Sequence, residues 1–183
     1  MFKTLGSAFK NRELRKSMLI TLLLLLVYRL GCFLPTPGLS ADFYSEISAN
    51  DNTGLLSLLN TVTGSALSNA AIFALGVTPY INASIIVQLL AVAIPALERL
   101  SKEGEEGKQK INMVTKIVAL VLALAQGLGI VLGLGSDLLQ PIFGEKLIWL
   151  TGTIVILVLM AGTCVTMWIG DKITEQGIGN GLS

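Results

Sequence analysis

Apolar residues dominate four stretches of the chain, and polar or charged segments separate them. The clearest stretch is 147–169, where twenty-three consecutive residues carry no charge. A helix needs about 20 apolar residues to cross the hydrocarbon core of a bilayer, because it rises 1.5 Å per residue. The pattern therefore predicts four transmembrane helices, at residues 18–35, 71–97, 113–134 and 147–169.

The segments between these stretches differ in polarity. Residues 54–70 are half apolar but too short to span, and they are rich in Ser, Thr, Gly and Asn. A short helix that enters the membrane from one side fits this composition. The remaining segments are predicted to lie outside the bilayer: an amphipathic segment at 1–17, loops at 36–53, 98–112 and 135–146, and a tail at 170–183.

Lysine and arginine orient the predicted spans, because cytoplasmic loops are enriched in them. Five precede the first span, five lie within 99–116, and Lys172 follows the last span. None lies within 31–98, and the loop at 135–146 has only Lys146. We therefore expect the N-terminus, the 98–112 loop and the tail to be cytosolic, with the loops at 36–53 and 135–146 external.

The composition agrees with a membrane protein. Hydrophobic residues make up 52% of the 183 residues and charged residues 14%, against about 25% charged in soluble domains. Histidine is absent, which removes the commonest general base and metal ligand. The predicted topology places Cys32 and Cys164 near opposite faces of the membrane, so we expect no disulfide between these two buried small residues.

Several residues inside the predicted spans are unusual for a helix that faces only lipid. The second span contains Asn82 and Gln88 with two prolines and a glycine, which suits a helix lining a polar cavity. Arg29 lies near the end of the first span, where interfacial anchoring or pairing with a carbonyl or carboxylate is favoured. Three glycines in the third span suggest close helix packing: Gly127, Gly129 and Gly133.

Three strings of unlike residues resemble the SecY family of protein-conducting channels. Residues 27–38 (VYRLGCFLPTPG) resemble the end of its first span, and residues 72–90 (IFALGVTPYINASIIVQLL) resemble the second half of its second span. Residues 173–183 (ITEQGIGNGLS) are similar to the cytosolic loop before its fifth span. The strings occur in family order and at about family spacing, so the resemblance covers essentially the whole chain.

The resemblance implies a fold. It is that of an all-α polytopic membrane protein, in which this chain supplies the first four of ten spans and a half-inserted plug helix, and lacks the other six. In this family the plug closes an hourglass-shaped pore from outside. The plug positions that it assigns here are Leu55, Leu58, Leu59, Val62, Gly64, Ser65, Ala66 and Leu67.

The resemblance also assigns the pore constriction and the lateral gate. Ile81 and Ile85 match the apolar pore ring, and their spacing of four stacks them on one helix face. An apolar ring seals around a passing chain without reading its sequence, and a dewetted constriction resists ion leak. Ile86, Gln88 and Leu89 are placed along the lateral gate, where a polar residue of this helix pairs across the closed gate in the family.

The implied function is translocation of unfolded secretory proteins across the bacterial cytoplasmic membrane, with sideways release of apolar segments into lipid. The implied partners are the remaining SecY spans, SecE, SecG, the SecA motor or the ribosome, signal peptides, nascent chains and membrane lipid. No cofactor, metal site or nucleic-acid contact is expected.

Two rival functions can be weighed from the residues. Half of a secondary transporter would need polar or charged coupling groups near the midplane, whereas the third and fourth spans offer only Gln126 and Thr163. A membrane enzyme would need a catalytic pair or a metal motif within the spans. With no histidine and no aspartate in any span, we expect no enzymatic activity.

Overall fold

The computed structural model describes residues 12–40, 42, 54, 58, 60–61, 63–133, 139, 147–177, 179 and 181. Within these residues the chain forms α-helices and no β-strand, apart from two isolated bridges. The all-α class that the sequence predicts is therefore confirmed for the described residues. The helices are α2 (Arg12–Gly31), α5 (Thr78–Ala93), α6 (Pro95–Lys102), α7 (Glu105–Gly133) and α8 (Ile148–Gln176).

Two of these helices are long and apolar enough to cross a membrane. They cover 27 residues at Glu106–Leu132 and 29 residues at Ile148–Gln176, within α7 and α8. α5 is apolar but shorter, with 16 residues. α2 has 20 residues, and its first turns are charged. The crossings predicted at 18–35 and 71–97 therefore depend on arguments beyond helix length.

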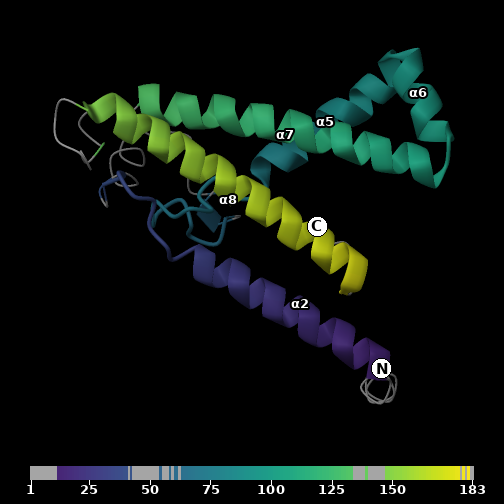
Figure 1. The fold of residues 1–183 in the computed structure, drawn as a ribbon, viewed down its shortest axis with the longest axis horizontal. Helices are drawn as coiled ribbons and strands as arrows, with labels where there is room; N and C mark the ends of the chain where they lie inside the picture. The colour runs from purple at the N-terminus through teal and green to yellow at the C-terminus, as the bar shows by residue number, and fades with distance from the viewer. Residues whose placement is uncertain are drawn as a thin grey trace.

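α7 and α8 pack against each other at their predicted external ends (Figure 1). Ala123 of α7 packs against Val155 and Leu159 of α8, and all three are almost completely buried. At Gly127 an added Cβ would lie 3.5 Å from Ile156, which shows how closely the helices approach there. An added Cβ on Gly129 would meet nothing within 4 Å, so its predicted packing role is not seen within the described residues.

Prolines mark where the next two helices begin. Pro79 lies in the first turn of α5 and Pro95 in that of α6, where the missing N–H costs no helical hydrogen bond. Ile94 between the helices is extended, with φ −107° and ψ 114°. α5 and α6 then fold back so that α5 lies along α7 (Figure 1).

α2 runs beside α8, and the two helices meet through a small apolar cluster. Leu24 packs against Ile169 and Ile173 of α8, and all three are buried. The start of α2, the turn between α6 and α7, and the end of α8 all lie toward the same end of the molecule (Figure 1).

Residues 63–77 form a chain of turns between the end of α2 and the start of α5. An isolated bridge joins Pro35 to Ala71, which holds this segment against the chain that leaves α2. α2 ends at Gly31, where an added Cβ would lie 2.1 Å from the ring of Phe73. Glycine is therefore needed at this position for the segment to approach the helix.

Other sequence predictions fall partly outside the described residues. The amphipathic segment 1–11, most of the two external loops, and plug positions Leu55, Leu59 and Val62 lie there. Both cysteines are free, as expected. Cys32 is completely buried, but Cys164 is exposed, so the expectation that both are buried is wrong for Cys164.

Candidate functional site

α5 has one buried face and one open face. Ala83 is completely buried and Val87 is 1% exposed, and Ala83 packs against Ala119 of α7 and Met167 of α8. Helical geometry places Ile81 and Ile85 on the opposite side, because successive residues turn by about 100°. These two side chains are 39% and 52% exposed. The two residues assigned to the pore ring therefore form one apolar strip that faces away from the rest of this chain.

The three residues assigned to the lateral gate do not all share that strip. Gln88 lies on the same side as Ile81, and Leu89 lies beside it with 67% of its surface exposed. Ile86 lies nearer the buried face and is 39% exposed. The Gln88 amide donates to the hydroxyl of Ser84, one turn earlier, with an N–O distance of 3.0 Å. Within this chain Gln88 therefore bonds to its own helix, and pairing across a gate stays a prediction.

The described plug positions lie in different environments. Leu58 is exposed. In this part of the chain the structure describes Leu58, Asn60 and Thr61 as helical. Residues 63–70 are turns, so this part of the expected plug helix is not helical. Gly64 and Ser65 adopt positive φ angles of 64° and 68°, which is a left-handed conformation that serine rarely takes.

The last two plug positions are buried. Ala66 is completely buried beside Cys32, Ala71 and Phe73, at the end of α2. Leu67 is 9% exposed and belongs to the cluster that includes buried residues of α7 and α8. The described contacts thus attach the plug end to α2, α7 and α8, rather than to the open strip of α5.

Two further contacts of α8 fix the turn segment that precedes α5. The Thr166 hydroxyl lies 3.2 Å from the carbonyl oxygen of Gly76 and 2.9 Å from that of Thr163 in its own helix, so these two acceptors share its one hydrogen. Thr166 and Gly76 are both buried. At Gly162 an added Cβ would lie 2.1 Å from the carbonyl oxygen of Ile72. The polar and small residues of α8 thus position the segment from which α5 starts.

Polar side chains also join the first turns of α5 to α7, and α7 to the end of α8. Lys116 and Asp171 form a partly buried ion pair between α7 and α8, with an N–O distance of 2.5 Å. The Tyr80 hydroxyl of α5 donates to Asn112 of α7 at 3.2 Å. The sequence analysis did not foresee either contact, although a lysine and an aspartate near the same ends of adjacent spans could have indicated the first.

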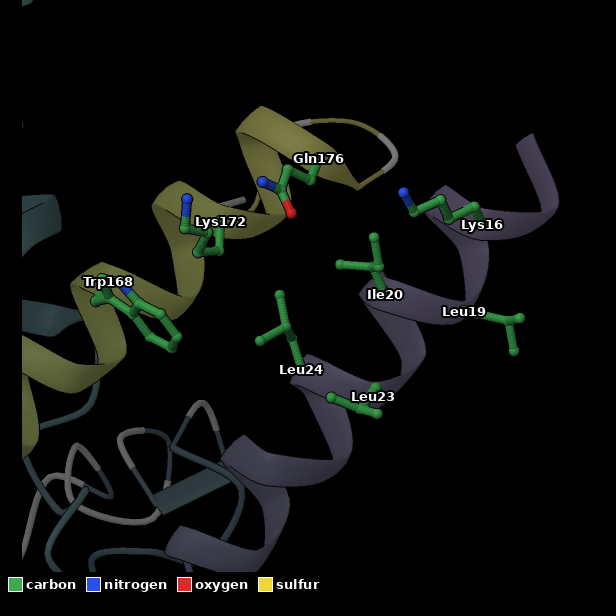
Figure 2. Close-up of a pocket in the computed structure, with 8 residues that line it drawn as sticks. All are labelled: Lys16, Leu19, Ile20, Leu23, Leu24, Trp168, Lys172 and Gln176. Atoms are coloured by element: carbon green, nitrogen blue, oxygen red, sulfur yellow. The ribbon is translucent and has the colours of Figure 1, made fainter. Parts of the chain in front are cut away.

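A groove of about 320 Å³ lies between α2 and α8, as Figure 2 shows. Trp168, Lys172 and Gln176 recur every fourth residue along α8, so they present one face to the groove. The α2 side is apolar except at its start, and it is lined by Lys16, Leu19, Ile20, Leu23 and Leu24. This groove is a second apolar surface that the chain leaves open, distinct from the strip on α5.

The described residues contain no cluster of three or more His, Cys, Asp or Glu side chains that could hold a metal ion. The features that the structure offers are therefore an apolar strip, a buried turn segment and the polar bonds that hold this segment. Such an arrangement can line a passage or change conformation.

Comparison with known proteins gives one consistent result. The family model described as SecY matches residues 71–183. The chain is 43% identical over 192 residues to "Protein translocase subunit SecY" of Streptomyces coelicolor, covering 100% of this chain and 44% of the relative. It is 40% identical over 194 residues to the protein of the same name from Buchnera aphidicola subsp. Acyrthosiphon pisum, covering 100% and 43%. The chain thus spans less than half the length of these curated relatives.

Proposed function

The chain belongs to the SecY family, and we propose that it forms the first part of a channel that passes unfolded secretory proteins across the cytoplasmic membrane. In this proposal Ile81 and Ile85 contribute to the pore ring, and residues 54–70 close the pore. Ile86, Gln88 and Leu89 line the gate through which apolar segments leave for the lipid. The chain acts as a conduit and not as an enzyme.

The open strip of α5 is the observation that carries this proposal. Its two isoleucines are exposed while the opposite face of the helix is buried against α7 and α8. A purely lipid-facing strip would explain the isoleucines alone. Asn82 and Gln88 are exposed on the same helix, and polar side chains in lipid are costly without partners. A strip of this kind suits the wall of a passage that other parts of the channel complete.

The environment of residues 71–77 supports a second crossing at 71–97, although helix α5 covers only part of that stretch. Irregular backbone at membrane depth is tolerated only where protein or a water-filled cavity surrounds it. Ala71, Phe73, Ala74, Leu75 and Gly76 are all buried, and backbone bonds such as Ile72 N–H to Leu34 O at 3.0 Å satisfy polar groups. The segment therefore meets the requirement for lying within the bilayer.

The arrangement of the helix ends supports the proposed topology. The start of α2, the α6–α7 turn and the end of α8 lie at one end of the molecule (Figure 1). The first two regions are rich in lysine and arginine, and the third carries Lys172. We propose that this end faces the cytosol, with four spans and both chain ends on that side. A SecA motor or a ribosome would meet the channel there, and SecE, SecG and the remaining SecY spans would complete it.

The transporter alternative gains little from the structure. The hydroxyl of Thr163 donates to the carbonyl of Leu159 in its own helix at 3.1 Å. Gln126 is only partly buried, and its amide oxygen has no partner among the described residues. One amide is a weak basis for an ion-coupling site, which usually combines several oxygen ligands or a titratable group.

Crosslinking from a stalled secretory chain tests the proposal. Single cysteines replace Ile81, Ile85 or, as a control, Ile156, in the full-length protein from which native cysteines have been removed. Ile156 packs at the α7–α8 contact beside Gly127, so it is a matched isoleucine away from the strip. We expect strong crosslinks at the first two positions and none at the third. Equal or absent crosslinks in an assembled complex would refute the pore assignment.

A further inference from the structure

The turn segment 63–73 is attached to the end of α2 at two places of different character. At one place the attachment is made by backbone groups: Thr36 N–H donates to Ala70 O at 2.8 Å, and Ile72 N–H donates to Leu34 O at 3.0 Å. At the other place the attachment is made by side chains. The backbone attachment resembles a short piece of sheet, whereas each contact of the side-chain attachment can break separately.

Arg29 makes the charged contact of the side-chain attachment. Its Nη1 atom lies 2.5 Å from the carbonyl oxygen of Gly64, to which it donates. The same guanidinium lies over the ring of Phe33, 5.1 Å from its centroid. Hydrogen bonds from charged donors are about twice as strong as neutral ones. Arg29 is exposed, so the bond lies at the surface of this chain and not in its core.

The backbone of Gly64 is shaped for this contact. Its φ of +64° is a conformation that glycine adopts without strain. An added Cβ at Gly64 would lie 2.9 Å from Arg29 Nη1, closer than side chains normally approach. The arginine can therefore reach the carbonyl because residue 64 has no side chain.

Two weaker contacts accompany the arginine. The Cys32 thiol lies 3.7 Å from the carbonyl oxygen of Thr63, and the Asn69 amide donates to the carbonyl of Cys32 at 3.2 Å. Cys32 is completely buried beneath this segment, next to Ala66. The burial of Cys32 therefore depends on residues 63–69 staying against α2.

We propose that Arg29 is a latch that holds residues 63–69 against α2, while the backbone bonds at 34–36 and 70–72 act as the fixed hinge. Breaking the contact between Arg29 and Gly64 lowers the barrier to release, and the segment then swings away when the packing of Ala66 and Leu67 also yields, without unpairing the hinge. This inference rests on the proposed channel function, in which the segment must move for a chain to pass. Arg29 is thus a positioning residue and contacts no translocating chain.

The rate at which N-ethylmaleimide labels Cys32 in the resting, assembled full-length channel tests the latch. Cys164 is replaced by serine, together with cysteines elsewhere in the protein, so that Cys32 is the sole thiol. We expect Arg29→Gln to raise the labelling rate about tenfold, which corresponds to about 1.4 kcal/mol. Arg29→Lys keeps a charged donor but loses the planar guanidinium. Cys32 in this variant is therefore expected to be labelled at a rate between those of the wild type and Arg29→Gln.

Arg15→Gln is the matched control, because it removes the same charge from the other end of α2 and should leave the rate unchanged. A stalled secretory chain should raise labelling in the wild type and add little in Arg29→Gln. If Arg29 were important only for folding, its replacement would change the amount of assembled channel. It would not change how strongly a stalled chain raises the labelling of Cys32. If Arg29→Gln fails to assemble, Arg29→Lys and Gly64→Ala replace it, and both are expected to label faster than the wild type.

If Cys32 in the assembled Arg29 variants is labelled at the wild-type rate, the proposal that Arg29 is a latch is wrong. That outcome is distinct from failure of the channel proposal, which would appear as missing crosslinks at Ile81 and Ile85. Labelling is measured without a substrate, so it reports on the latch even if the pore assignment is wrong.

Discussion

The α7–α8 pair and the turn segment 63–77 share one buried apolar cluster, but they differ in regularity and in the hydrogen bonds that supplement the packing. The helix pair is regular, and buried apolar side chains such as Ala123, Val155 and Leu159 join it. The turn segment has no regular structure. Leu67, Ala70, Ala74 and Leu75 pack into the same buried cluster, and backbone and side-chain hydrogen bonds hold the segment in addition. Apolar packing between spans is spread over many weak contacts, so it yields only gradually. Thr63 and Gly64, in contrast, are attached to α2 by discrete hydrogen bonds, so this part of the turn segment is the part suited to move first.

The largest loss of stability is expected from a substitution at the point where α8 contacts the backbone of the turn segment. Gly162→Ala places a methyl group against the carbonyl of Ile72, because its Cβ would lie 2.1 Å from that oxygen. We expect a loss of about 3 kcal/mol in stability, because the backbone must shift. Thermal unfolding of the purified channel in detergent measures it.

Gly129→Ala is the matched control for this prediction, since its Cβ would meet nothing within 4 Å. Equal destabilisation by the two substitutions would mean that the close approach of α8 to the turn segment is not important for stability.

A smaller effect is expected from the polar bond between the same two regions. Thr166→Val keeps the side-chain shape but removes the buried hydroxyl that the carbonyl oxygens of Gly76 and Thr163 share. The expected loss is about 1.5 kcal/mol, measured by the same unfolding experiment. Thr153→Val removes an exposed hydroxyl that bonds only to its own helix, and it should change stability much less. A larger loss at Thr153 would contradict the role assigned to Thr166.

The smallest loss of stability is expected from a substitution in the ion pair between α7 and α8. Asp171→Asn weakens its contact with Lys116, and a partly exposed pair of this kind contributes about 1 kcal/mol. A double-mutant cycle with Lys116→Met isolates the coupling, which should fall as salt is raised. A coupling larger than the Thr166 effect would mean that electrostatics, and not packing, holds the regular pair together.

The contrast between the two regions also explains what the sequence could reveal. Long uncharged runs predict α7 and α8, because a helix of apolar residues is the simplest structure that satisfies its backbone in a bilayer. In the sequence, Pro79 and Pro95 indicate a second span that lines a polar cavity, whereas the structure shows that both stand in the first turn of a helix. Their positions could have predicted the starts of α5 and α6.

Such sequence patterns do not predict the structure of the turn segment. Ser65 and Ala70 adopt φ angles of 68° and 47°, which their residue types do not favour, so only the surrounding contacts explain them. The bond from Arg29 to Gly64 joins residues 35 apart, and no periodicity marks it. The sequence favours interfacial anchoring of Arg29 or its pairing with a carbonyl or carboxylate, and it does not identify the carbonyl of Gly64. The pore and gate assignments came from family resemblance and stay predictions.

A reversible disulfide between native Cys32 and a cysteine at Ala66 tests the central claim, that residues 63–69 must leave α2 for a chain to pass. Both residues belong to one buried cluster, so the bond would fix the segment to the helix. Translocation of a secretory protein into proteoliposomes is compared before and after reduction, with Ala66→Ser as the control. The account predicts that the oxidised channel is blocked, that reduction restores transport, and that the control is unaffected. Equal transport by the oxidised and reduced channels would contradict it.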